Sequence, residues 1–123
     1  MRILFIITLV LNFLVETLAA TSLIGGPEGI TAVGLGGQWS MHYGFAALAI
    51  ASASVWIWPS RHNLEAVTPV LGILLTFHLG LLLSLTVAGD QMAGVIMHSV
   101  LVFLIVLLFV RRKKWCGIED SST

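Results

Sequence analysis

The chain is poor in charged residues and has almost no cysteine. Only 10% of its 123 residues are charged, with six Lys and Arg against six Asp and Glu, and 58% are hydrophobic. Soluble domains usually contain about 25% charged residues, so the composition excludes a water-soluble globule and a disordered chain. The balanced charge leaves no basic region for phosphates, which excludes an ordinary nucleic-acid binder. The single cysteine, Cys116, excludes an internal disulfide.

Most of the chain consists of long apolar runs, and its mean hydropathy is +1.02. A transmembrane helix needs about 20 apolar residues, so the chain has room for about four spans. The runs lack the in-and-out alternation of barrel strands. The sequence therefore predicts an all-α fold, a four-helix transmembrane bundle that forms a single integral membrane domain over 1–123. The predicted spans are about 3–24, 39–58, 67–88 and 92–110, followed by a cytoplasmic tail over 111–123.

The positions of the basic residues predict the orientation. Arg2 precedes the first span, Arg61 lies between the second and third spans, and Arg111–Lys114 follow the fourth. The other two connections, 25–38 and 89–91, contain no Lys or Arg. Because cytoplasmic loops are enriched in Lys and Arg, both termini are predicted to be cytoplasmic. We expect a multi-pass protein of the cell inner (plasma) membrane.

Aromatic residues near the span ends fit the same orientation. Trp and Tyr are enriched at both membrane–water interfaces. We expect Trp39 and Tyr43 at the outer interface, and Trp56, Trp58 and Trp115 at the inner one.

A cleaved signal peptide is an alternative interpretation of the first span. Arg2, the apolar run 3–15 and the small residues near 17–20 have that general form. Asn12 and Glu16 interrupt the apolar run, and the apolar character continues beyond the small residues. Cleavage would leave three spans with the N-terminus outside.

Four ionisable side chains fall inside the predicted spans: Glu16, His42, His78 and His98. Each is a candidate functional residue, because burial of an ionisable group in hydrocarbon is costly. Counting from the outer ends at 1.5 Å per residue places Glu16, His78 and His98 within roughly 5 Å of one depth. Asn12 shares the helical face of Glu16. These residues predict a polar core in the outer half of the bundle.

Helical spacing also predicts which faces point inward. His42 shares its face with three small residues that would let another helix approach closely, Ala46, Ala49 and Ala53. In the fourth span, Gly94 and His98 share a face with Gln91. We expect Glu16, His42 and His98 to face the interior.

The third span carries two faces that both look suited to packing. One is a small-residue stripe with a four-residue repeat, Gly72, Thr76, Gly80, Ser84 and Ala88. His78 lies on the opposite side, among leucines. Either His78 meets the bundle and the stripe meets another subunit, or the reverse. Both arrangements favour a homo-oligomer or a larger membrane complex.

The buried polar residues allow three kinds of chemistry. Imidazole and carboxylate groups bind zinc, copper or iron, and His78 and His98 are the metal candidates because they lie on adjacent antiparallel helices. The same two histidines could ligate haem axially. Glu16 could exchange a proton or act as a general acid. The alternative is a hydrogen-bond network, including Asn12, that only joins the spans.

The sequence resembles two families of small membrane proteins. Four short spans with Glu16 in the first resemble the small multidrug resistance transporters, which implies proton-coupled transport. The stretch 42–48, His-Tyr-Gly-Phe-Ala-Ala-Leu, follows a glycine- and proline-containing loop. Over about 14–58 this layout is similar to the DoxX-like group of small bacterial four-helix membrane proteins. That resemblance implies a role auxiliary to redox systems.

The function that the sequence favours is an accessory or assembly-type membrane subunit acting through helix–helix contacts. No catalytic motif is evident, and a non-enzymatic role is favoured. One alternative is a haem-, metal- or lipophile-binding protein that uses the intramembrane Glu and His residues, either in a redox-linked role or as an enzyme. Another is a small proton-coupled transporter centred on Glu16. The expected partners are membrane lipids and other membrane subunits, and not nucleic acid.

Overall fold

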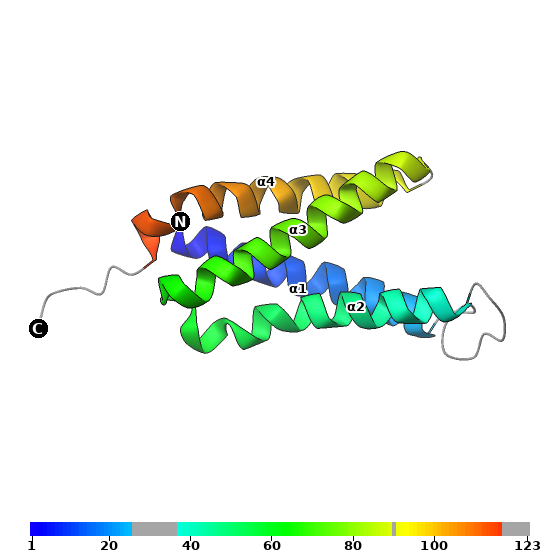
Figure 1. Ribbon diagram of the computed structural model, residues 1–123, viewed down its shortest axis with the longest axis horizontal. Coiled ribbons are helices and arrows are strands. Elements are labelled where there is room, and N and C mark those ends of the chain that lie inside the picture. Colours follow the sequence, from blue (N-terminus) through cyan, green and yellow to red (C-terminus); the bar gives the residue numbers. More distant parts are fainter. Residues whose placement is uncertain (26–36, 90, 117–123) are drawn as a thin grey trace, which may run out of the picture. The chain divides into compact units, whose positions relative to one another are not determined.

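A computed structural model of the chain describes residues 1–25, 37–89 and 91–116. These residues form four α-helices and one short 3-10 helix, and no strand occurs among them, so the predicted all-α class is confirmed. The predicted tail beyond residue 116 lies outside the described residues. The helices are α1 (Arg2–Gly25), α2 (Gly37–Trp56), η1 (Trp58–Ser60), α3 (Leu64–Ala88) and α4 (Met92–Trp115) (Figure 1).

Three of these helices are long and apolar enough to cross a membrane. Within the described part of the chain they are α1, α3 and α4. This is the composition expected of a small membrane protein. The second predicted span, over 39–58, corresponds to α2, which is less apolar because Ser40, His42, Ser52 and Ser54 lie within it. A fourth crossing and the orientation of the termini stay predictions.

The chain divides into two compact units, which are described separately. One unit comprises Met1–Thr8 and Ile57–Thr123, and therefore contains the start of α1 together with η1, α3 and α4. The other comprises Leu9–Trp56, and therefore contains the rest of α1 together with α2.

Local signals in the sequence set the two ends of α3. The Asn63 side chain accepts hydrogen bonds from the backbone N–H groups of Glu65 and Ala66, which caps the first turn. The helix ends at Gly89, which adopts a left-handed conformation with φ of 76° and donates its N–H to the carbonyl of Leu85. The helix thus begins a turn before the predicted apolar span.

Helices α3 and α4 form an antiparallel hairpin and pack against each other (Figure 1). Their buried residues recur every three or four positions, which places them along one face of each helix. We call this face the α3–α4 seam; it contains Val67, Leu71, Leu74 and His78 from α3, and His98, Leu101, Ile105, Leu108 and Trp115 from α4.

The last turn of α4 packs inside its own unit. The Trp115 ring lies 4.8 Å from the Phe5 ring, centroid to centroid, and its Nε1 donates to the carbonyl of Leu108 at 3.2 Å. Arg2 donates from Nε to the Trp115 carbonyl at 3.2 Å. Trp115 is therefore packed within its own unit, and its expected place at the inner membrane interface stays a prediction. Trp39, Trp56 and Trp58 are exposed.

In the second unit, the part of α1 after Thr8 and helix α2 lie side by side and antiparallel (Figure 1). Small residues of α2 face α1, and Ala47 and Ala51 are fully buried. A Cβ atom added at Gly44 would lie 2.6 Å from Cγ1 of Ile24 and 3.3 Å from the carbonyl oxygen of Ala20. Only glycine fits at Gly44, so the two helices approach closely there.

Candidate functional site

Two histidines meet in the α3–α4 seam, one from each helix. His78 comes eleven residues before Gly89 and His98 nine residues after it, so the antiparallel hairpin places them at one level. Their Nδ1 atoms lie 2.9 Å apart, and their ring centroids are separated by 5.2 Å. His78 is 0% exposed and His98 is 7% exposed. The pair is therefore a buried polar contact within an otherwise apolar seam.

The contact between the two rings is a hydrogen bond between imidazoles. One Nδ1 must carry a proton and the other must offer its lone pair, so the two rings are different tautomers when both are neutral. The Phe77 ring lies edge-on to His78, with ring centroids 5.4 Å apart. Both histidines sit on long helices rather than on loops, which fixes the positions of their backbones.

The distance between the two rings distinguishes two hypotheses for the histidine pair, axial ligation of haem and binding of a single metal ion. Axial ligands on opposite sides of a haem iron lie about 4 Å apart, twice a metal–nitrogen bond of about 2 Å, with the macrocycle between them. The Nδ1 atoms of His78 and His98 are 2.9 Å apart and in direct contact. The pair therefore does not fit bis-axial haem ligation through these atoms, whereas its separation is close to the one that a single ion held by both rings would require.

A second buried polar contact joins α1 to α2 in the other unit. The Asn12 side chain donates from Nδ2 to Oγ of Ser54 at 2.9 Å and to the carbonyl of Ile50 at 3.1 Å. Asn12 and Ser54 are both buried. Glu16 is also buried, one turn further along the same face of α1. The expectation that Asn12 and Glu16 share an inward face of α1 agrees with their burial.

His42 does not lie on an inward face. Its side chain is exposed and lies beside the exposed Trp39, with ring centroids 6.1 Å apart. The expected inward face of α2 is wrong: Ala46 and Ala49 are exposed and Ala53 is only partly covered. The buried face of α2 instead contains Gly44, Ala47, Ala51 and Ser54. Both faces consist of small residues, so residue size alone does not distinguish them.

Ser54 is the polar residue that the sequence analysis missed. It follows Ala47 by seven residues and Ala51 by three, which is the spacing of one helical face. Gly44 begins the same series. A search for small residues in a heptad pattern would have placed Ser54 opposite the polar face of α1.

The small-residue stripe of α3 lies on the outside. We call it the small-residue face: Gly72, Thr76, Gly80, Ser84 and Ala88. All of these residues are exposed except Gly72, which is partly covered, and His78 is on the buried side. A Cβ added at Gly72 or Gly80 would meet no atom of the described residues within 4 Å. Of the two arrangements considered for α3, His78 therefore faces the chain's own core and the stripe does not.

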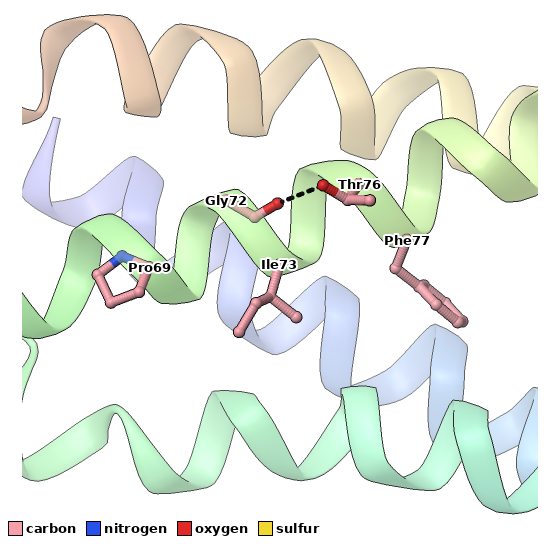
Figure 2. Close-up of a pocket in the computed structure, with 5 residues that line it drawn as sticks. All are labelled: Pro69, Gly72, Ile73, Thr76 and Phe77. Atoms are coloured by element: carbon pink, nitrogen blue, oxygen red, sulfur yellow. Dashed lines mark hydrogen bonds between the residues drawn. The ribbon is translucent and has the colours of Figure 1, made fainter.

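One end of the small-residue face forms a shallow depression. It is lined by five residues of α3: Pro69, Gly72, Ile73, Thr76 and Phe77 (Figure 2). The Thr76 hydroxyl donates to the carbonyl of Gly72 at 3.0 Å, which is the bond drawn in Figure 2. Because this hydroxyl is satisfied within its own helix, the depression offers a mostly apolar surface.

Comparison with protein-family models gave no match. Comparisons with curated proteins and with solved structures also gave none. The resemblances to the DoxX-like group and to the small multidrug resistance transporters therefore stay predictions, and the site must be interpreted from its own geometry.

Proposed function

We propose that this protein is an accessory or assembly-type membrane subunit that contacts another transmembrane helix through the small-residue face of α3. The observation that supports the proposal is the exposure of that face beside a seam that is already filled. Helices in lipid associate mainly through close van der Waals packing, which small residues permit. A face that is exposed within the described part of the chain is suited to packing against an external helix.

The chemistry of the face suits an apolar partner helix. From Gly72 to Ala88 it extends about 24 Å at 1.5 Å per residue, which is most of the thickness of a bilayer core of about 30 Å. The Thr76 hydroxyl is already bonded to Gly72, so burial against lipid-like side chains leaves it satisfied. The partner in this proposal is a helix of a second copy or of a larger membrane complex.

The proposed topology has four crossings, with α2 as the second and with both termini in the cytoplasm of the cell inner membrane. The support is the distribution of basic residues, which all lie at the start of α1, between α2 and α3, or at the end of α4. The connections on the opposite side contain no Lys or Arg. Cysteine-labelling of each connection in intact cells tests this topology directly.

The subunit proposal is tested with matched serine variants. Ser84 belongs to the small-residue face, whereas Ser99 is equally exposed on α4 and outside it. We expect Ser84→Ile to reduce association at least about tenfold, because a loss of about 1.4 kcal/mol changes an equilibrium tenfold. We expect Ser99→Ile to associate as the unmodified chain does.

Association is measured by single-molecule photobleaching in liposomes for a second copy, and by stoichiometric co-purification for a larger complex. The proposal fails if the unmodified protein is monomeric and co-purifies with nothing. It also fails if Ser84→Ile and Ser99→Ile behave alike.

A further inference from the structure

We propose that His78 and His98 together bind one transition-metal ion of the kind that prefers imidazole, such as copper or zinc. The ion would lie between the two Nδ1 atoms, inside the α3–α4 seam. This site is separate from the small-residue face, which lies on the other side of α3.

The distance between the ligand atoms is close to the distance that such an ion requires. Two nitrogens at about 2.0–2.1 Å from one ion and at a tetrahedral angle lie about 3.3 Å apart. The two Nδ1 atoms are 2.9 Å apart, so the rings need to separate by only about 0.4 Å. Small rotations of both side chains supply that movement without any shift of the helices.

The protons balance without an additional base. In the hydrogen-bonded pair, one ring carries its proton on Nδ1 and the other on Nε2. When the ion takes the place of the shared proton, the first ring moves its proton to Nε2. Both Nδ1 lone pairs then face the ion, and the two neutral rings release no net proton.

The surroundings also favour this class of ion. Imidazole nitrogens suit copper, zinc, nickel and iron, whereas calcium and magnesium prefer oxygen ligands. The seam residues flanking the pair, Leu74 and Leu101, are aliphatic and buried, so water competes weakly for the ion. Two imidazoles supply two of the four ligands of a tetrahedral ion, so the proposed site would need further ligands to complete its shell.

The test uses the purified full-length protein in detergent, with Cu²⁺ as the probe and Zn²⁺ in a second titration. We expect one ion per chain at this site. Paramagnetic resonance of the Cu²⁺ form should show coupling to two nitrogens. Each of His78→Gln and His98→Gln should weaken binding at least about 100-fold, because loss of a direct ligand exceeds the 10–100-fold typical of an outer-shell partner.

The matched control is His42→Gln, since His42 is exposed on α2; it should bind Cu²⁺ as the unmodified chain does. Equal binding by the unmodified chain and both seam variants would overturn the proposal. So would a Cu²⁺ spectrum of the unmodified protein without coupling to two nitrogens, and this measurement needs no variant to fold.

Discussion

The two helix pairs of this chain pack in different ways. In the α3–α4 seam, the buried positions are mostly large aliphatic side chains, such as Leu71, Leu74 and Ile105. In the α1–α2 pair, small residues of α2 meet α1, and the backbone of Ala20 comes within 3.3 Å of a Cβ placed at Gly44. The buried positions of one pair are large side chains that can adjust, whereas the other pair approaches closely at a glycine, where Cβ and backbone atoms leave little room for adjustment.

Each pair also contains one buried polar contact of a different kind. The α1–α2 contact uses Asn12, whose amide reaches a hydroxyl and a backbone carbonyl across the interface. The α3–α4 contact uses two imidazoles that face each other directly. The first arrangement joins two helices, whereas the second also brings together two side chains of a kind that binds metal ions. The difference is the basis for proposing a packing role for Asn12 and a binding role for His78 and His98.

The largest expected effect is at Gly44. Gly44→Val would press a side chain against Ile24, Leu23 and the backbone of Ala20, and should lower the free energy of unfolding by about 3 kcal/mol. The measurement is SDS titration in mixed micelles, followed by circular dichroism.

Gly94→Val is the comparison for Gly44→Val. A Cβ at Gly94 would lie 2.9 Å from Cδ1 of Leu85, the far end of a flexible side chain. We expect a cost of about 1 kcal/mol there, since rotation of Leu85 relieves most of the clash. Equal costs at the two glycines would contradict the distinction between the interfaces.

The second-largest expected loss of stability follows substitution in the histidine pair. His78→Leu leaves the Nδ1 of His98 without the partner seen here and should cost about 2 kcal/mol, the usual range for a buried polar group that loses its bond. The double variant His78→Leu with His98→Leu should cost less than the sum of the two single variants, because both polar groups are then removed. The same SDS titration measures all three proteins. Strict additivity would mean that the two rings do not interact.

The sequence predicted the helices well because length and apolar composition decide them. The first predicted span, 3–24, matches α1 within one residue at each end. The fourth starts at Met92 as predicted, but α4 continues to Trp115, since a helix does not end where the apolar residues end. Basic residues in its last turn are favourable near the negative end of the helix dipole.

The buried face of each helix was harder to predict than its bounds, and the reason is physical. In lipid, burial is not signalled by apolar character, because lipid-facing residues are apolar too. For α2, the sequence offered two small-residue faces, and the wrong one was chosen because it contained His42. For α3, the burial of His78 depended on its spacing from Leu71 and Leu74, which no difference in polarity reveals.

The third expected loss of stability follows substitution of Asn12. Asn12→Ala removes two hydrogen bonds across the α1–α2 pair and should cost about 1 kcal/mol, given about 0.6 kcal/mol for an average bond between membrane helices. A double-mutant cycle with Ser54→Ala isolates the side-chain bond from the bond to the Ile50 carbonyl. A coupling energy near zero between Asn12 and Ser54 would show that the amide interacts mainly with that carbonyl.

The smallest expected effect is at Gly72, on the small-residue face. A Cβ at Gly72 meets no atom of the described residues within 4 Å, and alanine is the better helix former. Gly72→Ala should therefore leave the free energy of unfolding of the monomer within about 0.5 kcal/mol of the original value, on the stable side. Gly80→Ala, with the same open surroundings, serves as its control. A loss comparable to that at Gly44 would mean that α3 packs on both sides within one chain, which would remove the free face on which the proposed subunit contact depends.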